Sequence, residues 1–145
     1  MIPPARPALG PALALILAAG LGGAALAQPF TTSAEVKPIL DMTRAHWLAL
    51  SAQPGQDLLY FTQIESWRCG ITQIRYSINS PDMTAIREVE SCYLGTNAPN
   101  ALRMEGHVPY VVLPAGVLES VAVVLFFDDG SHLTETYRRD QILMP

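Results

Sequence analysis

Cysteine, histidine and basic residues are scarce in this sequence, and each shortage excludes a class of function. The two cysteines stand too far apart for a C-x-x-C redox motif, and the three histidines follow no recognised spacing of metal ligands. Nine lysines and arginines are outnumbered by 13 acidic residues and lie scattered, apart from Arg138 and Arg139. No basic surface for nucleic acid is therefore expected, and no cofactor.

Signatures of catalysis are also missing. No G-x-S-x-G motif surrounds a serine, the many carboxylates single out no facing pair, and the ligand pattern of an EF-hand loop is absent. Residues 87–90, "REVE", are more typical of the solvated face of a short strand. We therefore predict no catalytic residue and no metal ligand. A non-enzymatic protein is favoured, and an enzyme is left open.

The enzymatic alternative is a small periplasmic hydrolase or metal-dependent enzyme that uses His132 with Asp128 or Asp129. Oxygen and nitrogen ligands that converge on a turn can hold a metal. The sequence Asp-Asp-Gly at 128–130 is also what a tight hairpin turn requires, and a histidine directly after such a turn is usually solvated. The pattern favours the turn.

The first 27 residues have the pattern of an export signal. Arg6 precedes an apolar run, and the small residues Ala25 and Ala27 place cleavage before Gln28. Glycines interrupt the run, which makes a membrane-spanning helix of about 20 apolar residues the weaker interpretation. The mature chain would hold roughly 118 residues, the size of one domain. We expect it in the periplasm or secreted, with no membrane span of its own.

Export decides how the two cysteines are interpreted. In an oxidising compartment a cysteine pair is most often a disulfide, so we predict a bond between Cys69 and Cys92. In the chain-entropy model a loop of that length restricts the unfolded chain by roughly 3 to 4 kcal/mol. Arg68 could instead lower the thiol pKa of a free Cys69 and make it a nucleophile. That alternative also needs a base, and no spacing identifies one.

A helix and a loop are expected first. After a flexible lead at residues 28–33, Ser33 is a residue type that caps helices and Glu35 suits a first turn, which predicts an amphipathic helix over about 34–45. Its apolar face has the spacing of Val36, Ile39, Leu40, Thr43 and Trp47. Residues 51–57 are predicted to form a loop, because Pro54-Gly55 favours a turn.

Strand patterns dominate the rest of the chain. The segments 58–67 and 71–78 predict two strands separated by Gly70, residues 86–89 a short strand, and residues 93–107 a long surface loop. The segments 117–127 and 132–138 predict a β-hairpin around the turn at 128–130. Because the first of its strands is apolar on both faces, it should be central, and its charged partner should lie at an edge.

These elements predict a mainly β protein. We expect one small antiparallel, sandwich-like domain over residues 34–145 with an N-terminal helix and one disulfide, and an α+β fold is the alternative. The segments "DLLYFTQIESWRCGITQIRYSIN", "CY…APNAL" and "LPAGVLESVAVVLFFDDG" resemble a group of small exported proteins of alphaproteobacteria. The resemblance implies a bacterial periplasmic setting, and it carries over no activity and no functional residue.

Aromatic residues suggest a binding function. Such side chains supply hot spots at interfaces, although they are equally typical of a β core. Those in question are Tyr60, Trp67, Tyr76, Tyr93 and Tyr110. The loop that runs from Tyr93 through Asn97 and Asn100 to Tyr110 is the expected partner surface, because long loops on rigid scaffolds often carry function. The partner would be an unknown envelope protein or ligand. A third hypothesis is a secreted inhibitor whose loop enters a protease.

Overall fold

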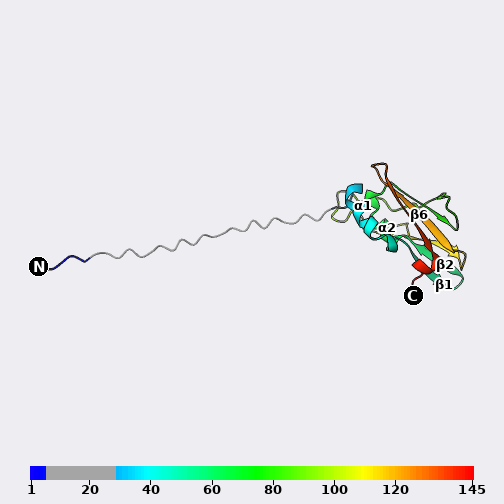
Figure 1. Cartoon of the computed structure of the whole chain (residues 1–145), viewed down its shortest axis with the longest axis horizontal. Helices are drawn as coiled ribbons and strands as arrows, with labels where there is room; N and C mark the ends of the chain where they lie inside the picture. Colours follow the sequence, from blue (N-terminus) through cyan, green and yellow to red (C-terminus); the bar gives the residue numbers. More distant parts are fainter. Residues whose placement is uncertain (6–28) are drawn as a thin grey trace.

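The computed structural model describes residues 1–5 and 29–145. The predicted cleavage site before Gln28, and the predicted export signal apart from its first five residues, lie outside the described residues. Across the described residues the chain is mainly β, as predicted, with two antiparallel sheets, short helices and one disulfide. Figure 1 shows both sheets in one folded body, with α1 where the chain enters it and the C-terminus beside β1.

The first sheet has the strand order β1-β2-β5. Its strands are β1 (Ala49–Gln53), β2 (Gln56–Tyr60) and β5 (Tyr110–Pro114). The predicted loop at 51–57 is wrong, because β1 and β2 form a hairpin whose turn is only Pro54 and Gly55. Gly55 has a φ of +79°, which a glycine adopts without strain. The polar residues that suggested a loop lie on strands with one solvated face. Strand β5 was not predicted.

The second sheet has the strand order β4-β3-β6-β7. Its strands are β3 (Gln73–Ile78), β4 (Ala85–Ile86), β6 (Ser120–Phe126) and β7 (His132–Arg138). The predicted hairpin is confirmed, since β6 and β7 pair in register around the turn. Strand β6 is central and buried at five consecutive positions, and β7 lies at the edge, as its charges indicated.

The chain passes from one sheet to the other through helical turns. The predicted strand over 58–67 is wrong beyond Tyr60, where α2 (Thr62–Glu65) and a 3₁₀ turn (Arg68–Gly70) follow. Phe61 and Ile64 are fully buried at helical spacing, which explains why the segment was rich in apolar residues without being extended. The 3₁₀ turn packs tightly on α1: a Cβ on Gly70 would lie 2.6 Å from the backbone oxygen of Thr32.

Helix α1 spans Ser33–Met42, so the helix ends earlier than expected and a 3₁₀ turn at Arg44–His46 follows. Its N-cap is Thr32, one residue before the predicted Ser33, and Thr32 and Glu35 form a capping box. Ser33 is instead buried, and its hydroxyl donates to the carbonyl oxygen of Gly70. Trp47 lies beyond the helix yet is fully buried, with its indole N–H donating to Leu40.

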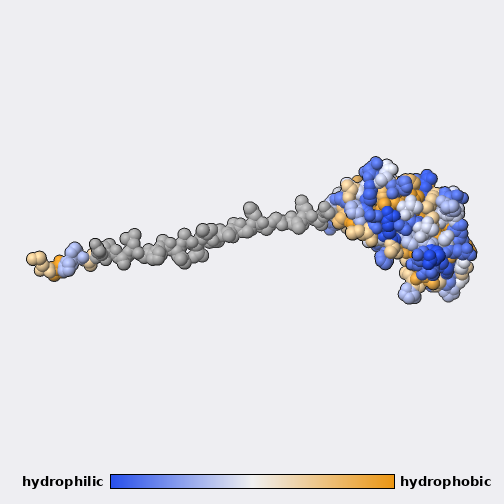
Figure 2. Space-filling model, in the orientation of Figure 1, coloured by the Kyte–Doolittle hydropathy of each residue, from blue (hydrophilic) through white to orange (hydrophobic). Residues whose placement is uncertain are grey.

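One hydrophobic core unites both sheets and α1. It includes Leu50 and Leu59 from the first sheet, Val123 and Leu125 from β6, and Leu40 from the helix. On the surface, the view in Figure 2 shows hydrophobic residues in small patches among hydrophilic ones. Because each sheet places one set of alternate side chains in this core, the other set faces outwards.

The C-terminal end closes the first sheet. Helix α3 (Arg139–Ile142) follows β7, and Leu143 forms a parallel bridge with Leu50 of β1. Arg139 donates to both carboxylate oxygens of Asp57, at 2.5 and 3.1 Å. Asp57 is only 1% exposed, and its pKa is held below the ordinary value, chiefly by the hydrogen bond from Arg139. This ion pair joins β2 to the start of α3.

Candidate functional site

The predicted disulfide is present and anchors the long loop. Cys69 and Cys92 are bonded, with their Cα atoms 5.2 Å apart. Neither thiol is free, so the nucleophile interpretation of Cys69 is wrong. Residues 87–109 contain no strand or helix, and the predicted loop at 93–107 lies within them. The short strand predicted over 86–89 is wrong beyond Ile86, because β4 spans only Ala85–Ile86. The bond ties this loop to the 3₁₀ turn between α2 and β3.

Arg68 is a second anchor of the loop, and sequence inspection missed its role. Its side chain is buried, and its guanidinium donates to five backbone carbonyls. These belong to Glu65, Glu90, Ser91, Asn100 and Ala101. A guanidinium has five N–H donors in a fixed fork, which suits this arrangement. Arg68 therefore holds two separate parts of the loop together instead of activating a cysteine.

A buried carboxylate fixes the two ends of the loop. Glu65 is fully buried, and its oxygens accept from Arg87 at 2.7 Å and contact the Nε2 atom of His107 at 2.8 Å. The Arg87 guanidinium also lies 5.1 Å from the ring centre of Phe61. Both carboxylate oxygens are thus occupied by residues that begin and end the loop. The arrangement indicates that Glu65 has a structural role, which is to hold the two ends of the loop in place.

The residues expected to form the partner surface serve different purposes. Tyr93 donates to Glu90, and its ring lies 3.6 Å from the guanidinium of Arg103. Asn100 is internal to the fold, since its amide accepts from Cys69 and donates to Phe30.

Two of these residues share a hollow, and a third lies in a sheet. A hollow of about 190 Å³ beside Phe30 and Trp67 is lined by Asn97 and Asn100. Residues 29–33, predicted as a flexible lead, thus take part in packing, with Phe30 edge-on to Trp67. Tyr110 lies in β5, with its ring centre 5.2 Å from that of Tyr60.

The turn that carries the alternative metal site is engaged in other contacts. Lys37 forms an ion pair with Asp129, and this interaction holds the pKa of that carboxyl well below its ordinary value. Ser131 also donates to Asp129. The ring of His132 lies 6.0 Å from that of Phe126. Among the described residues no group of three or more His, Cys, Asp and Glu side chains is placed to hold a metal ion.

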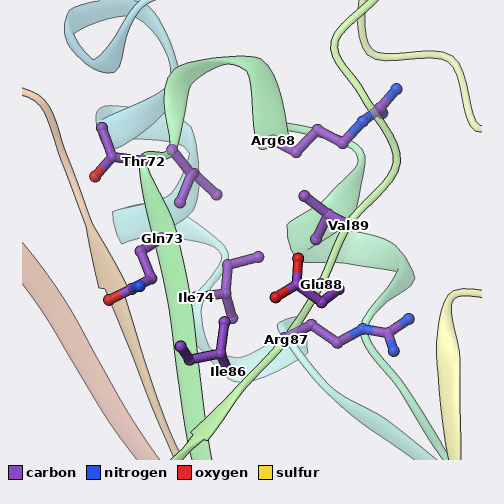
Figure 3. A pocket seen from close by; sticks show the side chains of 9 residues that line it. Arg68, Thr72, Gln73, Ile74, Ile86, Arg87, Glu88 and Val89 are labelled. Atoms are coloured by element: carbon purple, nitrogen blue, oxygen red, sulfur yellow. The ribbon is translucent and has the colours of Figure 1, made fainter.

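A small polar pocket opens where β3 and the segment after β4 diverge. It has a volume of about 240 Å³, and Thr72, Gln73 and Ile86 contribute to its walls. Figure 3 shows the Glu88 carboxylate directed into this space, while the guanidinium groups of Arg68 and Arg87 point away from it. With a single carboxylate aimed inwards, the pocket offers no pair of groups for acid–base chemistry.

The outer side of the first sheet is the most distinctive surface. Core residues alternate along its strands with side chains that face away from the core, and the register places the latter in three rows across the sheet. The nine outward side chains, named here the uncharged face, are Ala49, Tyr60 and Tyr110, then Ser51, Leu58 and Val112, then Gln53, Gln56 and Pro114.

This uncharged face combines exposure with apolar character. None of its nine residues carries a charge, and Val112, in the middle row on the edge strand β5, is 58% exposed. A hollow of about 470 Å³ adjoins it and is lined by His46, Trp47, Leu48, Ala49, Tyr60, Thr62, Gln63 and Met144. Ala49 and Tyr60 belong to both. An apolar surface next to a hollow that can take a side chain is typical of a protein-binding site.

Sequence inspection identified only part of this surface. Tyr60 and Tyr110 belonged to the aromatic set considered for binding, but Leu58 and Val112 were not considered. The missing signal was the short run "YVVLP" at 110–114, whose aromatic and β-branched residues are typical of a strand. The pairing with β2 could not be foreseen, because 51 residues lie between Leu59 and its partner Val111 in the chain.

No protein-family model, curated protein sequence or solved structure matches this chain. In the part of the chain that the structure describes, no helix has the length and apolar character needed to span a membrane.

Proposed function

We propose that this chain is a non-enzymatic, exported protein that binds another polypeptide of the bacterial envelope through the uncharged face. The observation that carries the proposal is the composition of that surface: nine outward positions on three paired strands, all without charge. Charged residues make up 15% of the chain, and none of them lies at these nine positions. Tyr60 and Tyr110, which share one row of this face, supply apolar rings with polar hydroxyl groups, as residues of binding hot spots do.

The way in which the long loop is held also supports a binding function. A disulfide, a buried arginine and a buried ion pair fix residues 87–109 before the chain enters β5. Such rigidity pre-organises the adjoining strand, and a pre-organised surface loses less conformational entropy on binding.

Export to the periplasm or beyond is part of the same proposal. It is supported by the signal-like pattern of the first 27 residues and by the disulfide, because disulfides persist chiefly in oxidising compartments. An accessory protein of the envelope would meet its partner there.

Site-specific crosslinking in intact cells tests the proposal. A photoreactive phenylalanine analogue at position 110 replaces one aromatic residue of the uncharged face by another, and the matched control carries the same analogue at Thr136, an exposed position of β7. We expect a discrete crosslinked product from position 110 only. A second change, Ser51→Asp, places a charge on the same face and should abolish that product. Equal products from both positions, or none from position 110, would overturn the proposal.

Affinity measurement with the purified crosslinked partner provides the quantitative version. Val112→Asp should weaken binding at least tenfold, because a desolvated carboxylate would face an apolar contact without a counter-ion. Thr136→Asp adds the same charge to another exposed strand position and should leave the affinity unchanged.

A further inference from the structure

The four edges of the two sheets differ in how they are protected. At β1, the backbone oxygen of Leu50 accepts from Met144 of the C-terminal segment. At β7, Arg44 donates to the backbone oxygen of Thr134. Strand β4 has only two residues and runs directly into the charged Arg87. Charges, shortness and covering segments are the usual means by which proteins prevent an edge from pairing with another chain.

Strand β5 has none of these protections over most of its length. It is a five-residue edge strand without a charged side chain, and none of the other described strands pairs with its outer side. Only Pro114 at its end lacks a backbone N–H, a feature common at sheet edges. The preceding residues Tyr110 to Leu113 therefore leave an open, uncharged edge.

The register shows which backbone groups point outwards. Phe61 donates to the carbonyl oxygen of Pro109, so residues 59 and 111 form the next hydrogen-bonded pair between β2 and β5. Tyr110 and Val112 fall at the alternate, non-hydrogen-bonded positions. Their N–H and C=O groups therefore point away from β2, and their side chains are those of the uncharged face. A single bound segment could therefore form backbone hydrogen bonds with β5 and contact the side chains of the uncharged face at the same time.

The size of the uncharged face limits what can occupy it. Three strands about 4.8 Å apart and five residues of about 3.4 Å each cover roughly 240 Å². A stable interface between folded proteins buries about 800 Å² on each partner. The face alone is too small for a second copy of this chain or for another folded domain. An extended segment fits better, because it would add main-chain hydrogen bonds to the apolar contact.

We propose that the partner binds as an extended, uncharged segment that adds a strand to the outer edge of β5. The hydrogen bonds would involve the N–H and C=O groups of Tyr110 and Val112. Alternate side chains of the segment would extend the uncharged face beyond β5. This inference rests on the proposed function and specifies the form in which the partner is recognised.

A displayed library of random linear decapeptides is the probe, selected against the purified protein. The test compares two variants at one position. Val112→Pro removes the outward N–H, whereas Val112→Thr keeps it and preserves the branched shape. We expect the selected peptides to alternate uncharged residues, to bind Val112→Thr within about threefold of the original affinity, and to lose at least tenfold with Val112→Pro. A tenfold loss corresponds to about 1.4 kcal/mol.

A second measurement guards against misfolding of the proline variant. Semisynthesis can replace the amide between residues 111 and 112 by an ester, which removes the same N–H without a ring. Its effect on affinity should match that of Val112→Pro. Hydrogen exchange should also show new protection at the amides of Tyr110 and Val112 when a peptide is bound.

Each contrary result has its own meaning. Peptides that bind Val112→Pro and the ester as well as Val112→Thr, yet are blocked by Val112→Asp, would overturn strand addition and leave the uncharged face as a binding site. Failure to select any peptide would overturn the extended-segment form of recognition, whereas the cellular crosslink separately tests the proposed function. A concentration-dependent dimer that Val112→Pro abolishes would identify the occupant as a second copy and overturn the proposal.

Discussion

Replacing Arg68 by methionine should destabilise the protein more than any substitution of an exposed arginine. The methionine keeps much of the apolar stem but removes every donor. Five backbone carbonyls then lose their partner. In the structure, the shortest distance from the guanidinium to each of these oxygens lies between 2.6 Å (Glu90) and 3.2 Å (Glu65). Arg68 is only 4% exposed, so water cannot reach the freed carbonyls unless the loop moves.

The magnitude follows from two limits. A hydrogen bond to a charged group contributes about 1.5–3 kcal/mol, and five such bonds would sum to as much as the whole stability of a small domain. They do not act independently, because residues 87–109 can separate locally while the bond between Cys69 and Cys92 keeps the loop tethered. We therefore expect a loss of about 3–5 kcal/mol, which corresponds to about two such hydrogen bonds and is well below the sum of five.

Urea denaturation followed by tryptophan fluorescence measures the loss, with an unchanged dependence on denaturant as the sign of a purely stability effect. The matched control is Arg138→Met, because the Arg138 side chain is exposed and its guanidinium forms an ion pair with the equally exposed Asp140. This variant should leave the midpoint unchanged. Arg68→Lys should recover only part of the loss, since three donors cannot serve five carbonyls. If Arg68→Met costs less than about 1 kcal/mol, the reasoning is refuted.

Three further changes test other parts of the fold. Gly70→Ala should lower stability by about 1–3 kcal/mol or more, because a Cβ there would meet a backbone oxygen at 2.6 Å, and an unchanged melting temperature would contradict the packing. Joint replacement of Cys69 and Cys92 by serine should cost about 3 kcal/mol in urea denaturation, and a denaturation curve that reductant leaves unaltered would argue against the bond. Arg139 lowers the pKa of Asp57, so the stability from this pair is present above the ordinary pKa of about 4 and is lost as pH falls below it. Stability should decline from about pH 5 to pH 3, less steeply in Asp57→Asn, and equal slopes would refute the role of this carboxylate.

Several features of the fold could be predicted because their causes are local or compositional. The hairpin of β6 and β7 was predicted from an Asp-Asp-Gly turn between two extended patterns, and the disulfide from a pair of cysteines in a sequence with an export pattern. The central place of β6 followed from apolar residues on both of its faces. Helix α1 was placed to within a few residues, and its cap was shifted by one because Glu35 stands three residues after Thr32 and forms a capping box with it.

The candidate binding site could be predicted only in part. Tyr60 and Tyr110 were singled out as aromatic residues, but the expected surface ran along the loop, where Asn100 in fact bonds to the backbone of Cys69. A sequence shows which residues are polar or aromatic. It does not show whether an amide or a ring faces solvent or a neighbouring segment.

The sequence by itself determined the β class, the principal hairpin and the pairing of the two cysteines, because turn chemistry, side-chain alternation and cysteine number act over short range or by composition. Only the tertiary structure decided that β2 pairs with β5, that Arg68 gathers five carbonyls, and that nine uncharged side chains share one outer surface. These depend on the register between distant segments, where a shift of one residue would turn the opposite set of side chains outwards.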